Sequence, residues 1–235
     1  MGITWQFPAD LSIVGWLEAR GYAYEILTDE DLHRDGAAAL APYQGVLTGT
    51  HPEDHSERML DGLEDYVAAG GRLTDTGGNG FYWMVAFRDD DLSCMEVRKL
   101  DSGMCAWRPR PGEHYLQTTG EKGGWWRMRG RAPQKLAGVG FIAEGFEHCQ
   151  PYRRMPDSYY RHADGIMAGI EGEIVGDFGL AHGGAGGIEL DRYDLKLGTP
   201  PHALIVASSG GHSDNYIVVT EELLYAYQGL TGSQD

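Results

Sequence analysis

The feature that most constrains the fold of this 235-residue chain is a strand, a helix and a second strand in direct succession. The apolar stretch YQGVLTGT is followed by PEDHSERMLDGLEDYVAAGG, in which Met59, Leu63, Tyr66 and Val67 repeat at helical spacing. RLTDTGG then has the pattern of a second short strand. Strands joined by helices of this length form a parallel sheet with both faces covered. The sequence therefore predicts an α/β fold.

The chain before this unit shows the same alternation of elements. FPADLSIVGWLEARGY has helical spacing and ends at Gly21, and we expect Asp10 to cap it by accepting backbone N–H bonds. YAYEIL alternates as a strand does. In the later helix, we expect Pro52, Glu53 and Asp54 to form the first turn, because proline fits there and acids complement the positive end.

The middle of the chain, from about residue 88 to residue 154, is Gly-rich and aromatic, with basic residues interleaved. We expect an irregular insertion of short strands and long loops within a single domain that spans residues 1–235. After it, HALIVASSGGHSDNY has the pattern of a strand followed by a polar turn, and YIVVTEELLYAYQGL that of a closing helix. No internal repeat is visible.

The charge balance limits the possible partners. The chain has 35 acidic and 19 basic residues, for a formal net charge of −16. Nucleic acids and anionic membranes attract clustered Lys and Arg, so we expect neither as a partner. We find no apolar run long enough to span a membrane, no signal peptide, and only three scattered cysteines. We therefore expect a cytoplasmic protein that acts on a small molecule.

Two segments follow predicted strands, at the edge of a parallel sheet where ligands gather. THPEDH carries the densest set of ligands and proton carriers, His51, Glu53, Asp54 and His55. The plain alternative for the two acids is a polar helix start. TGGNGFYW holds Asn79 among glycines that allow close backbone approach, and its amide can face a substrate or an oxyanion. This spacing matches neither a phosphate-binding loop nor a nucleophile elbow.

Two further loops are weaker candidates. TTGEKGGWW places Glu121 between glycines, where an acid is either a ligand or simply solvated. SSGGHSDNY offers Ser208, Ser209, His212 and Asp214, which are too close in sequence for a hydrolase triad. No zinc-binding HExxH helix occurs.

Together these stretches resemble a known family. ADLSIVGWLEARGYAYEILTDEDLH, VLTGTHPEDHS, AAGGRLTDTGGNGFYW, GGWWRMRGRAPQKLAGVGF and SSGGHSDNY resemble, in order, the C-terminal domain of the large (beta) subunit of N,N-dimethylformamidase. The resemblance implies a fold similar to class I glutamine amidotransferases. It also implies hydrolysis of a small amide to an amine and a carboxylic acid, and a mononuclear iron held by two tyrosinates and one glutamate.

Only one of the three metal ligands that the resemblance implies is found at its expected position in this sequence. Glu121 matches the family's glutamate, but Ser12 and Asp54 stand where we expect the two tyrosines. Asp54 can still bind iron or another divalent metal through oxygen, whereas serine is a poor ligand. The family's large subunit has a further domain before this one, and a small subunit packs on it. We therefore expect a missing companion domain or subunit, or a homo-oligomer.

The resemblance implies a metal-assisted hydrolase of a small amide, and we expect the amide to be uncharged, since a carboxylate-rich site repels anions. The roles expected of the residues are catalysis for His51, Glu53 and Asn79, substrate contact for Tyr82 and His212, and metal binding for Glu121 and Asp54. The alternative is a catalytically inactive amidotransferase-like domain that serves binding or assembly. The amidase prediction requires the loops of His51, Asn79 and Glu121 to meet in one pocket.

Overall fold

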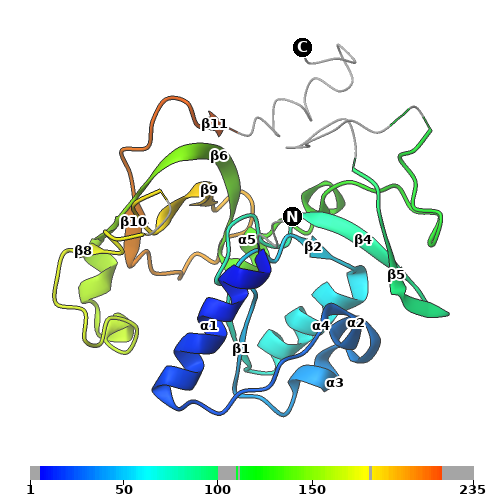
Figure 1. The fold of residues 1–235 in the computed structure, drawn as a ribbon, viewed down its shortest axis with the longest axis horizontal. Coiled ribbons are helices and arrows are strands. Elements are labelled where there is room, and N and C mark those ends of the chain that lie inside the picture. Colours follow the sequence, from blue (N-terminus) through cyan, green and yellow to red (C-terminus); the bar gives the residue numbers. More distant parts are fainter. Residues whose placement is uncertain (1–5, 100–109, 111, 180–181, 219–235) are drawn as a thin grey trace.

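The computed structural model describes residues 6–99, 110, 112–179 and 182–218 as two halves joined side by side (Figure 1). The first half contains the helices α1 to α4 and the strands β1 to β5. The second contains β6 to β11. The polar segments THPEDH and TGGNGFYW lie where these halves meet.

The first half begins with α1 (Gln6–Arg20), which ends before Gly21 as predicted. Asp10 lies inside this helix and does not cap it, because its carboxylate accepts hydrogen bonds from the backbone and side chain of Thr50. After an extended stretch come α2 (Asp29–Asp35) and α3 (Ala37–Leu40).

Two small sheets follow in this half. The strands β1 (Gly45–Leu47) and β3 (Arg72–Thr74) pair in parallel around α4 (Glu57–Ala68), which confirms the predicted strand–helix–strand unit. The strand β4 (Trp83–Arg88) pairs in parallel with β2 (Asp54–His55) and in antiparallel fashion with β5 (Asp91–Val97).

The helix α4 begins later than predicted. Its cap is Ser56, whose hydroxyl accepts the backbone N–H of Met59 and contacts His33 Nδ1 at 2.7 Å. Glu53 and Asp54 are therefore not in the first turn. They lie in an extended segment held against the start of β4, where the Glu53 carbonyl accepts the N–H groups of Tyr82 and Trp83.

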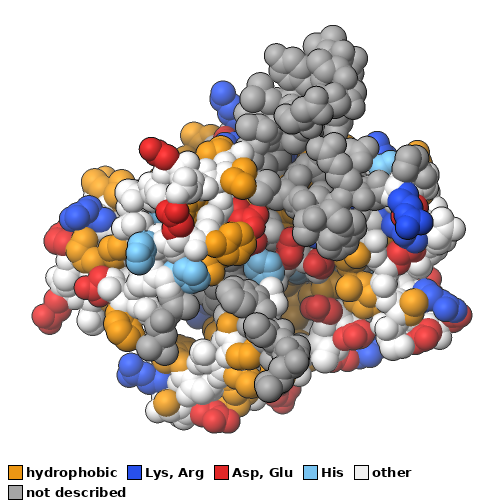
Figure 2. Space-filling view, turned by 45° about the horizontal axis from the view of Figure 1, so that its top comes forward, with side chains coloured by type: hydrophobic (Ala, Val, Ile, Leu, Met, Phe, Trp, Pro, Cys, Tyr) orange, Lys and Arg blue, Asp and Glu red, His pale blue; other side chains and the backbone are white. Residues whose placement is uncertain are grey.

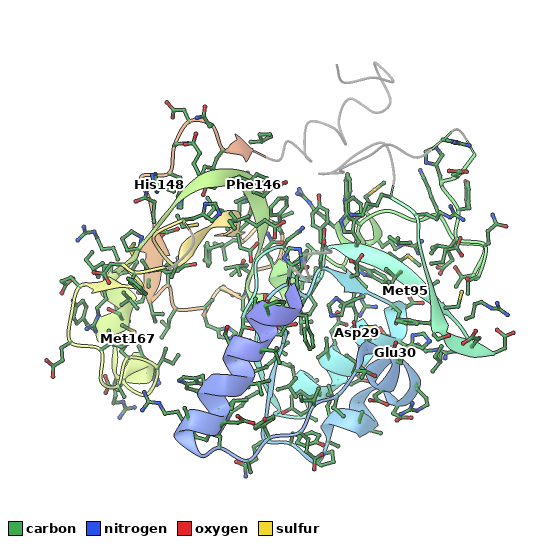
Figure 3. The ribbon with its side chains drawn as sticks, viewed as in Figure 1. Asp29, Glu30, Met95, Phe146, His148 and Met167 are labelled. Atoms are coloured by element: carbon green, nitrogen blue, oxygen red, sulfur yellow. The ribbon has the colours of Figure 1, made fainter. Side chains whose placement is uncertain are left out.

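The second half is antiparallel. The long strand β6 (Val139–Gln150) lies between β9 (Gly186–Tyr193) and β11 (Ile217–Val218). The strand β7 (Tyr152–Arg154) lies between β8 (Ile174–Val175) and β10 (Ala207–Ser209). Among the described residues, four short helices lie between β5 and β8 in sequence: η1 (Trp126–Arg129), which packs on the first half, and α5 (Gln134–Ala137), η2 (Pro156–Tyr159) and η3 (Arg161–Ala163). Figure 3 labels Phe146 and His148 on the outer part of β6, where Phe146 is exposed.

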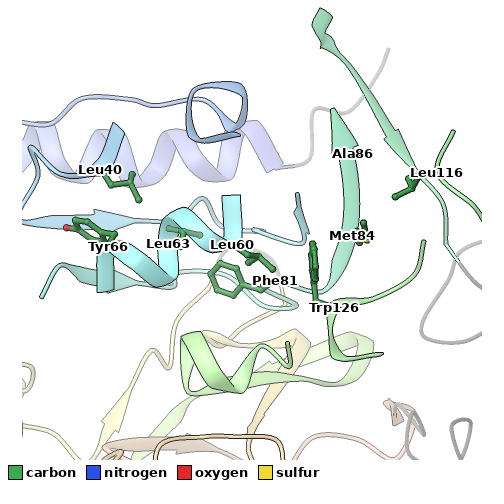
Figure 4. Close-up of a cluster of buried hydrophobic side chains, with 9 residues drawn as sticks. All are labelled: Leu40, Leu60, Leu63, Tyr66, Phe81, Met84, Ala86, Leu116 and Trp126. Carbon is green, nitrogen blue, oxygen red and sulfur yellow. The ribbon is translucent and has the colours of Figure 1, made fainter. Parts of the chain in front are cut away.

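The main core joins the helices of the first half to the aromatic middle segment (Figure 4). Leu60, Leu63 and Phe81 pack with Leu116 and Trp126, and all five are buried. The Trp126 indole donates to the carbonyl oxygen of His55 at 3.0 Å. Part of the segment expected to be an irregular insertion therefore contributes to the core of the first half.

Several predicted elements differ in the structure. Residues 22–27 are extended but form no ladder, so YAYEIL is not a paired strand. Within HALIVASS, only β10 is a strand. The predicted closing helix lies almost entirely outside the described residues. The described part is mixed α/β with several small sheets, and the likeness to amidotransferases stays a prediction. No helix in this part has both the length and the apolar character needed to cross a membrane.

Candidate functional site

The centre of the site is the imidazole of His51, held between two carboxylates. His51 Nε2 donates to Glu53 Oε2 at 3.2 Å, and Nδ1 donates to Glu189 Oε2 at 3.1 Å. Glu53 comes from the first half and Glu189 from β9 in the second. The three side chains are about one-fifth exposed, so water and a small solute can reach them. The site therefore lies at a junction, which is a common place for ligand binding.

Glu53 also anchors the TGGNGFYW loop. Its Oε1 accepts hydrogen bonds from the Asn79 side-chain amide at 2.9 Å and from the Trp83 indole at 2.7 Å. Lys99 lies over the Trp83 ring, 4.6 Å from the centroid. Two of the predicted catalytic residues, Glu53 and Asn79, are thus hydrogen-bonded to each other. The other carboxylate oxygen of Glu53 contacts His51, so Glu53 links Asn79 to His51.

The backbone of the Asn79 loop is strained and tightly packed. Asn79 and Phe81 have positive φ angles of 56° and 57°, and Ile188 on β9 has one of 61°. Non-glycine residues rarely adopt this conformation, which costs of order 1 kcal/mol and often marks functional sites. At Gly77, a Cβ would lie 2.4 Å from the Thr50 carbonyl oxygen. A glycine is required there for the loop to reach the segment of His51.

The second half supplies three acids that the sequence analysis missed. Glu144 on β6 lies opposite Glu189 in the ladder, so both side chains share one face of the sheet. Asp191 accepts the backbone N–H of Asn79 at 3.3 Å. The sequence did contain a pattern that predicts the positions of two of these acids. Glu189 and Asp191 alternate with apolar residues in GIELDRY, which puts both on one face of a strand. Figure 2 shows acidic and histidine side chains beside one another in the middle of one face.

The charges around the site shift the pKa values of its groups. The hydrogen bonds to Glu189 and Glu53 raise the pKa of His51 to about 10, so the ring is an imidazolium at neutral pH. Burial acts to raise the pKa of Glu53, but the contact with His51 and the charge of Lys99 outweigh it and lower that pKa. Burial, together with Asp75, raises the pKa of Asp191 to about 7. Burial, together with Glu189 and Glu53, raises that of Glu144.

Asp54 and His55 face other surroundings. Burial and the neighbouring Glu53 raise the pKa of Asp54 to about 6, and Asp29 at the start of α2 adds to the shift. His55 is fully buried against Phe81, 4.8 Å between ring centroids, and burial lowers its pKa to about 4. His55 is therefore a neutral core residue.

The two predicted substrate-contact residues lie apart in the structure. Tyr82 is only 4% exposed, in an aromatic cluster with Trp83, Trp125 and Phe141. His212 lies in the loop after β10, where its Nε2 contacts the Ser209 hydroxyl at 3.0 Å. No contact among the described residues joins His212 to His51, so the structure gives no support to a shared binding surface.

The predicted metal ligands do not converge. Glu121 forms an ion pair with Arg129 at 3.0 Å, and no described contact connects it to His51 or Asn79. Ser12 lies on the exposed face of α1, where its hydroxyl donates to the Pro8 carbonyl. No three of the described His, Cys, Asp and Glu side chains are grouped so as to hold a metal ion. Iron binding through Glu121 and Asp54 stays a prediction, and the chemistry proposed for the site is derived from the described side chains of the His51 network alone.

A separate cavity lies away from this network. It has a volume of about 500 Å³ and is lined by Tyr43, Tyr66 and Arg72, among others. Arg72 begins β3, so this cavity is at the opposite end of the strands from the site. None of the predicted catalytic residues lines it. We place the site at the His51 network, where the titratable groups meet.

The network combines a proton donor, His51, with two carboxylates that contact it and with the Asn79 amide, which is hydrogen-bonded to one of these carboxylates. These are the groups that general acid–base catalysis needs. We call the set His51, Glu53, Asn79, Glu144, Glu189 and Asp191 the junction network.

Comparison with known sequences shows which proteins this chain is similar to. The family model described as N,N-dimethylformamidase beta subunit-like, C-terminal, matches residues 2–233. The N,N-dimethylformamidase beta subunit of Paracoccus aminophilus is 44% identical over 234 residues, which are 99% of this chain and 31% of the relative. The beta subunit from Alcaligenes sp has the same identity and coverage. The chain thus spans about a third of the length of these relatives.

Proposed function

The chain belongs to the N,N-dimethylformamidase beta subunit-like, C-terminal family, and from this premise we propose that its junction network hydrolyses a small, uncharged amide. The observation that carries the proposal is the His51 imidazolium between Glu53 and Glu189, at the meeting of two halves. The family resemblance of the sequence is confirmed. Of the three loops expected to meet in one pocket, the proposal keeps those of His51 and Asn79, which Glu53 links, and gives Glu121 no part in the reaction.

The proposed reaction uses the proton of His51 and the basicity of Glu189. Water attacks the amide carbonyl carbon while Glu189 takes its proton, and the carbonyl becomes a tetrahedral oxyanion. The C–N bond then breaks as His51 gives the proton on Nδ1 to the leaving nitrogen, while the proton on Nε2 stays in the contact with Glu53. Glu189 returns its proton to His51 across their 3.1 Å contact, and a carboxylic acid and an amine are released.

The substrate class follows from the charge around His51. Glu53, Glu144 and Glu189 repel a substrate that carries a carboxylate or a phosphate. A neutral amide avoids that repulsion, and the Asn79 amide is positioned to help orient one. A hydrogen-bond donor stabilises the transition state most when its side chain is fixed before the substrate binds. Glu53 fixes the side-chain amide of Asn79 in this way.

The test is release of dimethylamine from dimethylformamide by the purified chain, with and without added iron, with the metal content measured alongside. We expect His51→Gln and Glu189→Gln to lower the rate by roughly 10²- to 10⁴-fold, the usual contribution of a general acid or base. Asp177→Asn, at an exposed acid in the second half, serves as the control. Absence of turnover in both conditions would remove the enzyme assignment.

The second candidate function is a binding or assembly domain without catalysis. The observation that favours it is the position of Ser12 on the exposed face of α1, where the family resemblance implies a tyrosinate. The double change Ser12→Tyr and Asp54→Tyr, followed by iron loading, tests it. Visible phenolate-to-iron absorption would tie the chain to iron chemistry, while its absence together with inactivity favours assembly.

A further inference from the structure

The position of Glu189 depends on an irregular part of β9. Its carboxylate contacts His51 Nδ1 at 3.1 Å, and the residue before it, Ile188, has a φ of 61°. The ladder between β6 and β9 changes register directly after the pair formed by Gly145 and Ile188. A shift of one residue in a strand moves its side chains to the other face of the sheet. The contact with His51 therefore requires that the backbone at Ile188 is held in place.

Tyr216 packs against this irregular part from the other side of β6. Its side chain is 9% exposed, and it directly precedes β11, which pairs with β6 on the edge opposite β9 (Figure 1). A Cβ at Gly145 would lie 2.6 Å from the Tyr216 ring, so the ring lies directly against the backbone of this glycine. Gly145 is the ladder partner of Ile188. The ring thus supports the pair of residues that comes just before Glu189.

The hydroxyl of Tyr216 extends as far as β9. Burial and the nearby Cys149 raise the pKa of Tyr216, whereas the backbone N–H of Ile188 acts to lower it, which places the hydroxyl near this N–H. The hydroxyl is buried, and among the described residues it makes no hydrogen bond of regular geometry. Packing of the ring, rather than a hydrogen bond, is therefore the contact by which Tyr216 supports the strand.

The loop between β10 and β11 holds the Tyr216 ring. The His212 ring packs on it, with 5.0 Å between the centroids, and His212 Nε2 contacts the Ser209 hydroxyl at 3.0 Å. Ser209 in turn lies against the start of β9, since a Cβ at Gly186 would be 2.9 Å from the Ser209 Cβ. The loop therefore reaches β9 at two points, Gly186 and Ile188. His212, which was predicted to contact substrate, belongs to this support.

We propose that Tyr216 is a positioning residue: its ring, held by the loop of His212, fixes the start of β9 so that the Glu189 carboxylate stays against His51. The consequence for the rate of amide hydrolysis rests on the proposed function of the junction network. The consequence for the His51 ring does not, because the contact between His51 and Glu189 is present whether or not the site is catalytic.

The test compares Tyr216→Leu with the conservative Tyr216→Phe in the purified chain. Nitrogen-15 NMR measures the pKa of the His51 ring, and release of dimethylamine from dimethylformamide measures the rate. Tyr216→Leu removes the ring and should lower the His51 pKa by about 1 to 3 and the rate roughly 10- to 100-fold, because the carboxylate moves away from the imidazolium. Tyr216→Phe keeps the ring and should leave both measurements close to those of the unchanged chain. Tyr160→Leu changes a tyrosine in the second half that is 57% exposed and serves as the control.

Two further variants separate positioning from a general loss of stability. In a chain that already carries Glu189→Gln, Tyr216→Leu should lower the His51 pKa no further, because both changes remove the same contact. Gly145→Ala forces the Tyr216 ring to move and should lower the pKa as Tyr216→Leu does. It decides the question if Tyr216→Leu does not fold.

A folded Tyr216→Leu chain with an unchanged His51 pKa would overturn the proposal, and so would an equal fall of that pKa in Tyr160→Leu. If the pKa falls in Tyr216→Leu alone but the unchanged chain hydrolyses no amide, the positioning role is supported and the proposed function is removed.

Discussion

The protonation of Asp191, at the junction of the two halves, makes the stability of the protein depend on pH. Burial and the Asp75 charge raise the pKa of Asp191 from 3.8 to about 7. The folded chain therefore keeps a proton on Asp191 that the unfolded chain loses. Between these two values the free energy of unfolding falls as the pH rises, because the native state binds more protons. Above about pH 7 the native state holds a buried charge next to Asp75.

The first prediction is that Asp191→Asn stabilises the protein at alkaline pH. Asparagine cannot ionise, and its carbonyl oxygen can still accept the Asn79 N–H. We expect the rise in the free energy of unfolding to be roughly 1–2 kcal/mol larger at about pH 8.5 than at about pH 5.5, because the destabilisation by Asp191 grows between its two pKa values. Urea denaturation at both pH values measures this. The exposed Asp177→Asn is the control, and an equal effect of Asp191→Asn at both pH values would contradict a buried, ionising carboxyl as the cause.

At this scale the sequence predicted part of the site. His51, Glu53 and Asn79 were expected together because they follow two successive parallel strands, and they do lie together. The sequence did not predict the three acids of the second half, Glu144, Glu189 and Asp191. They are far from His51 in sequence, and only the folding of the chain brings their strands next to it. Glu121 was predicted as a metal ligand from the family resemblance. In the structure its carboxylate forms an ion pair with Arg129.

At the scale of elements, helix ends and glycines decide where the site residues lie. The segment of residues 51–55 runs extended beside β4, and α4 begins only at the Ser56 cap. Helical spacing predicted the body of α4 well, because its apolar face is local in sequence. It could not predict the helix start, since the pairing of Asp54 with Trp83 comes from a distant segment. The same limit explains residues 22–27, whose strand pattern has no partner in the described structure.

The second prediction concerns the cap of α4. Ser56→Ala removes an acceptor for the Met59 N–H and a partner of the buried His33. We expect a loss of about 1–2 kcal/mol in the free energy of unfolding. Thermal and urea denaturation measure it, with the exposed Ser208→Ala for comparison. A loss no larger than that of Ser208→Ala would mean that Ser56 does not hold the helix start.

The third prediction compares alanine substitutions at two glycines, one in the tightly packed Asn79 loop and one in α1. Gly77→Ala puts a Cβ against the Thr50 carbonyl oxygen, 2.4 Å away, and should destabilise the chain by roughly 1–3 kcal/mol and shift the Asn79 loop. Gly15→Ala in α1 meets no atom within 4 Å and should stabilise by up to about 1 kcal/mol, because alanine favours helix. Denaturation of both variants tests the sign. If Gly77→Ala were neutral, the loop would not be tightly packed.

At the scale of the whole molecule, the two halves contribute different parts of one site. The first half brings His51, Glu53 and Asn79, and the second brings Glu144, Glu189 and Asp191. Composition predicted an acidic, compact chain, but not the junction, because contacts between segments far apart in sequence form it.

The measurement that tests this account most directly is a nitrogen-15 NMR titration of the His51 ring, assigned with His51→Gln. If Glu53 and Glu189 both hold the ring, it stays an imidazolium through neutral pH and titrates at about 10, and Glu189→Gln lowers that pKa. A ring that titrates near the ordinary value of 6.5, unchanged by Glu189→Gln, would contradict the meeting of the two halves at His51.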